Sequence, residues 1–173
     1  MSFSIERSIE ILERTPLVLK QLLSGLPEHW TGVNEGPETW SPYDVIGHLI
    51  HGETTDWTKR MDIILSDGGN KEFATFDRFA QFQESKGKSL EQLLNTFHDE
   101  RKSNITYLLS KNISKTDLQK TGIHPKFGKV TLQQLLSTWV AHDLDHIMQI
   151  SRVMAKQYRE DVGPWKEYLK IMQ

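Results

Sequence analysis

The last long apolar-periodic segment of the chain carries the run Trp-Val-Ala-His-Asp-Leu-Asp-His at residues 139–146. His142 and His146 are four residues apart, so on a helix their imidazoles lie one above the other on the same face. Apolar residues follow roughly the same stripe: Leu135, Trp139, Ile150 and Val153. The pair is therefore expected to face inward, where an unpaired polar group costs about 1–3 kcal/mol. A bound metal ion would satisfy both imidazoles at once.

Three further amphipathic segments predict that this helix is one of four. Helices are expected over residues 4–24, 41–65, 89–111 and 131–158. The last three begin with Ser or Thr followed three residues later by Asp or Gln, a capping pattern, and Pro16 is expected to kink the first. No stretch alternates with period two for long enough to predict a sheet. We therefore expect an all-α four-helix bundle that forms a single domain over residues 1–173.

The connections between these helices are long. Residues 26–39 and 114–129 are rich in Gly, Pro and polar residues and are predicted to be loops that build the rim of a substrate site. Four phenylalanines recur at every third position between the second and third helices and are expected to cover one end of the core: Phe73, Phe76, Phe79 and Phe82.

The composition narrows the classes of function. The net charge is −2 and no strongly basic patch stands out, so nucleic acid is not an expected partner. No apolar run approaches the ~20 residues that span a bilayer, and the N-terminus lacks the layout of a secretory signal, so a cytoplasmic protein is expected. The chain has no cysteine, so a transition-metal site must use His, Asp or Glu.

A third metal ligand should come from another helix. His48 is the first candidate, because Gly52 one turn later would leave room beside an ion. His51 is its rival and would replace or supplement it. His98 is less attractive, because the charged residues 99–102 suggest a solvated surface. Three histidines would leave a coordination position open, which is the pattern of a catalytic site. The alternative is that these histidines bind no metal and are structural residues held by hydrogen bonds.

Acidic residues also lie near the histidines in the sequence, and each has two possible roles. Glu53 is the candidate general base, with a position at the surface as the alternative. Asp143 and Asp145 project about 100° around the helix from the neighbouring histidines, so they are expected to be exposed or bonded to another helix.

Two segments carry a resemblance to a known family. Residues 39–49 read Thr-Trp-Ser-Pro-Tyr-Asp-Val-Ile-Gly-His-Leu, which resembles the start of the second helix in the DinB/YfiT superfamily. Residues 124–132 and 139–150 resemble the loop and fourth helix of the same group, so that the resemblance spans nearly the whole chain. It implies a four-helix bundle with up-down-down-up topology. It also implies a divalent metal held by three histidines, which are carried over here as follows: His48, His142 and His146.

The resemblance implies more than one chemistry. The superfamily includes transferases and isomerases that use bacillithiol, mycothiol or glutathione, and members described only as metal-dependent hydrolases. The first hypothesis is therefore a metal-dependent transferase that joins a low-molecular-weight thiol to an electrophilic small molecule. The second is a hydrolase with metal-activated water and Glu53 as base, and the third is a non-enzymatic, metal-stabilised bundle or stress-response module. Zn or Ni is expected first, with Mn or Fe as alternatives, and relatives suggest a homodimer.

Overall fold

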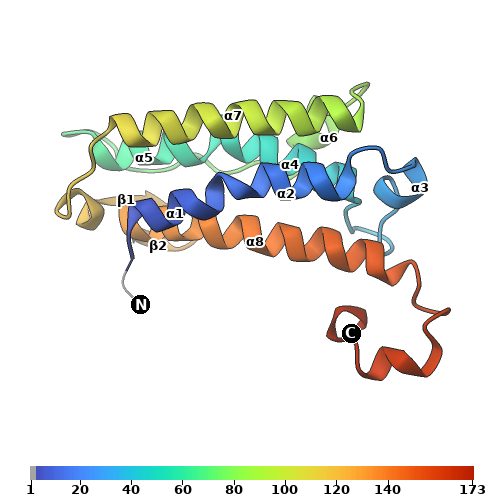
Figure 1. Cartoon of the computed structure of the whole chain (residues 1–173). Helices are drawn as coiled ribbons and strands as arrows, with labels where there is room; N and C mark the ends of the chain where they lie inside the picture. Colours follow the sequence, from blue (N-terminus) through green and yellow to red (C-terminus); the bar gives the residue numbers. More distant parts are fainter. Residues whose placement is uncertain (1–2) are drawn as a thin grey trace.

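The computed structural model describes residues 3–173 and folds as a four-helix bundle (Figure 1). The bundle has four columns of helix, which are in chain order α1 (Ile5–Leu12) with α2 (Arg14–Leu23), α4 (Pro42–Thr55) with α5 (Trp57–Leu65), α7 (Leu90–Ser110), and α8 (Leu132–Lys156). In Figure 1 the first and last columns run from left to right, and the second and third run from right to left. This is the expected up-down-down-up order.

Local sequence sets where the helices begin. Each of the three predicted caps forms a reciprocal capping box, in which the cap hydroxyl accepts from the third helical N–H and the third side chain accepts from the cap N–H. The pairs are Ser41 with Asp44, Ser89 with Gln92, and Thr131 with Gln134. The predicted helix ends also lie within two residues of the observed ones.

Two of the columns are broken. The first is interrupted at Glu13, as Pro16 predicts, because proline has no N–H to donate to the carbonyl of Leu12 four residues earlier. The second is interrupted at Asp56, whose φ of −115° and ψ of −71° depart from helical values. This second break was not predicted. Trp57, the first residue after it, stacks on Trp139 of α8 with ring centroids 5.7 Å apart.

Short elements fill the connections. They are α3 (Glu28–Thr31), α6 (Ala80–Glu84), η1 (Asp117–Gln119), β1 (Thr121–His124), β2 (Gly128–Thr131), η2 (Gly163–Glu167) and η3 (Lys170–Met172). The expectation that residues 114–129 form only a loop is wrong, because β1 and β2 pair as an antiparallel hairpin. The strands have four residues each, which is too short for a period-two pattern to appear. Gly122 lets the hairpin approach the core, since a Cβ there would lie 2.4 Å from Cε1 of Phe73.

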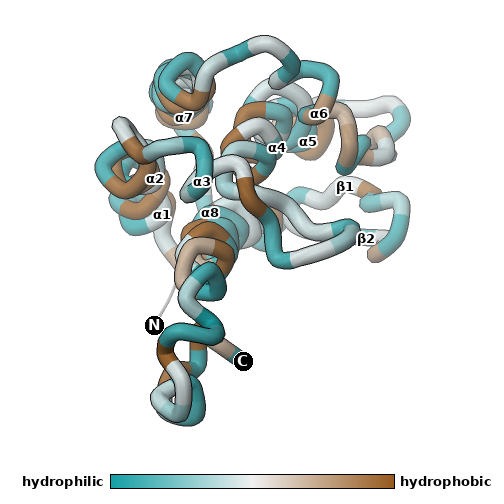
Figure 2. The backbone as a smooth tube through the Cα atoms, turned by 90° about the vertical axis from the view of Figure 1, so that its right-hand side faces the viewer, coloured by the Kyte–Doolittle hydropathy of each residue, from teal (hydrophilic) through white to brown (hydrophobic). Residues whose placement is uncertain are grey.

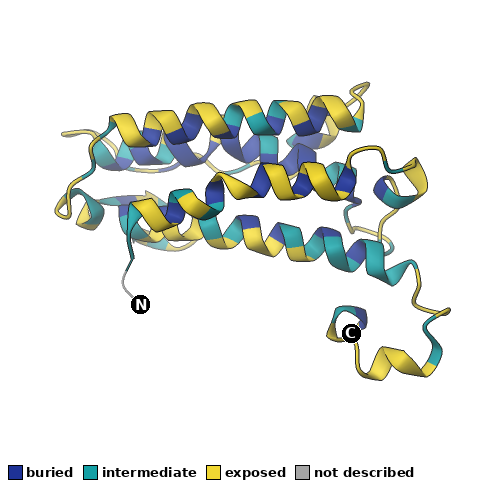
Figure 3. Cartoon of the chain, viewed as in Figure 1, coloured by how far each residue is buried: buried dark blue, intermediate teal, exposed yellow. Residues whose placement is uncertain are grey.

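Apolar side chains face the centre of the bundle. Figure 3 shows the buried stripe on the inner side of each long helix, and Figure 2 shows apolar residues of the columns turned toward one another. Of the four phenylalanines, Phe73 joins the core, whereas Phe79 and Phe82 are 65% and 42% exposed, so the expectation that all four cover the core is wrong. Within residues 3–173, no helix combines the length and the apolar character needed to cross a membrane.

Candidate metal centre

Three histidines from two columns converge at one point in the bundle. His48 comes from α4, and His142 and His146 come from successive turns of α8. Nε2 of His142 lies 3.1 Å from Nε2 of His48 and 3.1 Å from Nε2 of His146. Two imidazole nitrogens that share one zinc ion at its usual bond length are about 3.0–3.4 Å apart. The spacing of the three rings therefore fits a shared cation.

The surroundings keep these imidazoles neutral. Burial lowers the pKa of His48 to about 3 and that of His142 to about 2, and the neighbouring imidazoles add to both effects. Burial also lowers the pKa of His146, although its hydrogen bond to Gln149 opposes the change. A metal ligand must offer an unprotonated nitrogen, so this environment suits metal binding.

Gln149 fixes the orientation of one of the rings. Its Oε1 lies 2.7 Å from Nδ1 of His146 and accepts a hydrogen bond from it. The proton is then held on Nδ1, which leaves the lone pair of Nε2 directed toward the other two histidines.

Aromatic side chains enclose the rings. Trp40 packs on His48 with ring centroids 4.8 Å apart and stacks against His146 at 6.5 Å. Trp57 meets His142 edge-on at 5.2 Å. Nε1 of Trp57 also lies 3.3 Å from where a Cβ of Gly52 would stand, so the glycine makes room for the indole.

A cavity of about 410 Å³ opens beside the three imidazoles. Its wall is mainly aromatic, and the hairpin contributes His124, Phe127 and Val130 to it. Its fully charged side chains are Asp56, Arg60 and Arg78, and besides the histidines its aromatic side chains are Trp40, Trp57, Phe73, Phe76 and Phe127. A second, more polar groove of about 750 Å³ adjoins the cavity and shares Trp40, Arg78 and His146 with it. Two differently lined spaces therefore meet at His146.

The other candidate ligands lie apart from this centre. Nδ1 of His51 lies 2.9 Å from a carboxylate oxygen of Glu84 on α6, so His51 faces the connection rather than the cluster. His98 is partly exposed, with 41% of its side chain accessible, and its Nδ1 lies 3.2 Å from Oδ1 of Asp99. The structure thus brings together His48, His142 and His146 and leaves His51 outside.

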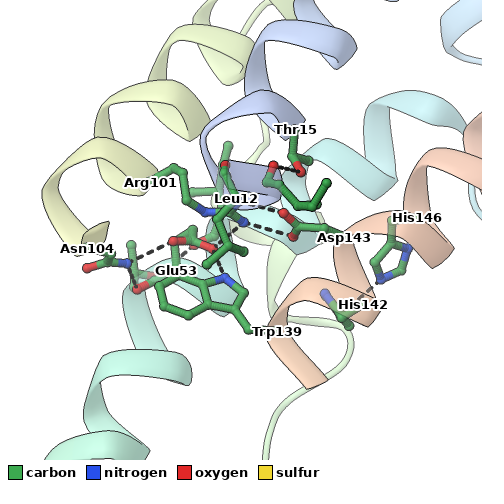
Figure 4. A network of polar contacts seen from close by, with 12 residues as sticks. Leu12, Thr15, Glu53, Arg101, Asn104, Trp139, His142, Asp143 and His146 are labelled. Atoms are coloured by element: carbon green, nitrogen blue, oxygen red, sulfur yellow. Dashed lines mark hydrogen bonds and ion pairs between the residues drawn. The ribbon is translucent and has the colours of Figure 1, made fainter. Parts of the chain in front are cut away.

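Glu53 is buried, with 2% of its surface exposed, so the alternative that it lies at the surface is wrong. Oε1 accepts hydrogen bonds from Nη2 of Arg101 at 2.8 Å and from Nε1 of Trp139 at 2.9 Å. Oε2 accepts from Nδ2 of Asn104 at 2.9 Å. Figure 4 shows this carboxylate inside the network, and it does not line the cavity.

Arg101 is the centre of that network. It is 1% exposed, so the expectation that residues 99–102 form a solvated face is wrong at this position. Besides Glu53 it binds Asp143, with Nη2 2.9 Å from Oδ1. Asp143 is thus bonded to another helix, which was one of its two expected situations.

Sequence reasoning missed the charged residues of the cavity wall. Asp56, placed by the break between α4 and α5, is 8% exposed, and its Oδ1 lies 2.6 Å from Nε of Arg60. Burial raises the pKa of Asp56 to about 6, although Arg60 and His51 oppose the rise. The i, i+4 spacing of Asp56 and Arg60 is visible in the sequence, but it is equally typical of a surface ion pair.

Comparisons with known proteins agree with this architecture. A family model described as the DinB superfamily matches residues 11–150. The fold is similar to that of YfiT from Bacillus subtilis, described as a probable metal-dependent hydrolase with an unusual four-helix bundle topology. The two chains are 20% identical, the match covers 90% of each, and the TM-score is 0.74. No curated protein matches the sequence.

Proposed function

The chain belongs to the DinB superfamily, and on that basis we propose that it is a metal-dependent enzyme that acts on a small molecule. Its metal would be held by His48, His142 and His146. The observation that carries the proposal is the convergence of three neutral imidazole nitrogens at the side of an aromatic cavity. Zn or Ni is the first expectation and Mn or Fe the alternative, because imidazole suits all four.

Hydrolysis is the reaction that we place first. The similar fold of a protein described as a probable metal-dependent hydrolase supports it. A bound divalent ion with three protein ligands would keep a position open and would lower the pKa of a water or thiol there.

The residues of the chain supply the rest of the chemistry. We propose that Asp56 is the general base. Among the described residues, it is the one that brings a carboxylate to the cavity wall. Its raised pKa, about 6, lies close to neutral pH, where a general base works best. Glu53, the base expected from the sequence, instead holds Arg101 in place, since both its oxygens already accept hydrogen bonds.

Thiol transfer is the second candidate. The polar groove that meets the cavity at His146 supports it, because a transferase must seat two molecules beside one centre. In that case a low-molecular-weight thiol would occupy the groove and an electrophilic small molecule the cavity.

Both candidate functions require a metal bound by the three histidines, and metal analysis tests this requirement. The protein is purified without an affinity tag, beside a His142→Ala/His146→Ala variant and a His98→Ala control that removes a partly exposed histidine. We expect about one equivalent of transition metal in the native protein and the control, and none in the double variant. Equal metal contents in all three proteins would overturn the proposal.

Turnover then separates the candidates. The metal-loaded protein is assayed on small chromogenic esters, and on electrophiles with bacillithiol, mycothiol or glutathione. Product that requires a thiol would select transfer, and product without one would select hydrolysis. Stoichiometric metal without turnover in either assay would leave a metal-stabilised bundle.

A further inference from the structure

The charges in the cavity wall do not balance. Among the described residues that line it, the fully charged side chains are Asp56, Arg60 and Arg78. Nε of Arg60 lies 2.6 Å from Oδ1 of Asp56 and both side chains are only 11% exposed, so these two opposite charges offset each other. Arg78 is exposed at the mouth of the cavity, and none of the ion pairs within residues 3–173 involves it. The cavity therefore has a surplus positive charge at one place.

Arg78 stands at the junction of the cavity and the groove. Its Cζ lies 6.0 Å from the ring centroid of Trp40, and Trp40 in turn packs on His48. The guanidinium is thus near enough to contact a molecule seated beside the imidazoles.

The remaining wall is apolar and aromatic. Trp40, Trp57, Phe73, Phe76 and Phe127 contribute ring faces and edges. The cavity volume of about 410 Å³ lies within the range of small-molecule sites. Such a wall gains free energy from a planar apolar body, through burial and ring stacking.

We infer that the ligand of this cavity is a small aromatic carboxylate, whose ring lies against the aromatic wall and whose carboxylate binds Arg78. This assignment rests on the proposed function in taking the cavity as the substrate site. A guanidinium suits the role because its planar donors match the two oxygens of a carboxylate. The paired Arg60 is not available for the same contact.

Calorimetric titration with cinnamate and cinnamamide tests the inference. The two probes share one planar body and differ in charge. We expect the native protein to bind cinnamate at least about tenfold more tightly than cinnamamide. In Arg78→Gln this preference should vanish through weaker binding of cinnamate alone, and Arg78→Lys should restore part of it.

Arg152→Gln is the matched control. Arg152 lines the adjoining groove, but its Nε already lies 2.7 Å from Oε1 of Glu35, so we expect this variant to keep the preference. Equal affinities for the two probes in the native protein would overturn the inference, as would equal losses in Arg78→Gln and Arg152→Gln.

The titration is repeated after chelation of bound metal, which separates this inference from the proposed function. A preference that persists without metal and depends on Arg78 supports the carboxylate site even if no turnover is found. A preference that disappears with the metal and does not depend on Arg78 would overturn the site, because the carboxylate would then bind the ion.

Discussion

Arg101 donates a hydrogen bond from Nη1 to the main-chain carbonyl oxygen of Leu12, at a distance of 2.9 Å. This carbonyl needs a partner from outside its helix because Pro16, four residues later, has no N–H. The same guanidinium binds Glu53 of α4 and Asp143 of α8. One side chain of α7 thereby connects the other three columns, as Figure 4 shows.

Loss of Arg101 should destabilise the fold severely. In Arg101→Met, two buried carboxylates lose their cationic partner and the carbonyl of Leu12 loses its donor, and removal of one member of a buried ion pair costs about 3–5 kcal/mol. Urea unfolding followed by circular dichroism measures the difference in the free energy of unfolding. The control is Lys102→Met, at the exposed neighbouring position, which should stay within about 0.5 kcal/mol of the native protein. Similar losses in both variants would contradict a central role for Arg101.

A change at Asp56 should alter the pH dependence of catalysis. Burial raises the pKa of its carboxyl to about 6, so the basic form that accepts a proton accumulates as pH rises through 6. In the native protein, we expect kcat/KM of the metal-loaded enzyme on a small ester to rise as pH increases through 6. In Asp56→Asn this rise, the acid limb of the pH profile, should be absent.

Glu53→Gln provides the contrast for that experiment. It should keep the limb near pH 6 while lowering the free energy of unfolding, because its carboxylate binds Arg101 rather than lining the cavity. An unchanged rise near pH 6 in Asp56→Asn would overturn the role of Asp56, and loss of the rise only in Glu53→Gln would return the role of base to Glu53.

Metal affinity should resist moderate acidity. An ordinary imidazole gains a proton near pH 6.5 and then loses its affinity for cations. Burial lowers the pKa of His48 to about 3 and of His142 to about 2, and it also lowers that of His146, so protons compete only at lower pH. Competition with a chelator of known pH dependence should therefore give a constant affinity between about pH 6 and pH 8. A steep loss that begins at pH 6.5 would show that the rings are not held in a neutral state.

Much of the fold could be predicted because its determinants are local. Capping boxes and apolar periodicity act within a few residues, and the missing N–H of Pro16 can be read directly from the sequence. The break at Asp56 could not be predicted in this way. The hydroxyls of Thr54 and Thr55 both bind the carbonyl of His51, at 3.1 and 2.6 Å, and such bonds bend helices in some contexts but not in others.

The parts of the candidate site that lie close together in the sequence could be predicted, and those that depend on contacts between distant segments could not. His142 and His146 follow from their spacing on one helix. The preference for His48 over His51 rested on the room beside Gly52 and on the family resemblance, because spacing alone does not show how α4 is rotated against α8. Charged residues such as Glu53 and Arg101 look solvated in sequence. They are buried because each meets a partner 48 residues away, which no local pattern reveals.

Removal of the amide of Gln149 should weaken the metal centre without removing a ligand. Its Oε1 lies 2.7 Å from Nδ1 of His146 and holds the proton there, which leaves Nε2 directed toward the other two histidines. Loss of such an outer contact typically lowers metal affinity about 10–100-fold. We expect this loss in Gln149→Leu, measured by chelator competition, and little loss in Gln149→Glu, which retains an acceptor. Equal affinities in Gln149→Leu and the native protein would show that the orientation of His146 comes from the packing of Trp40 against its ring instead.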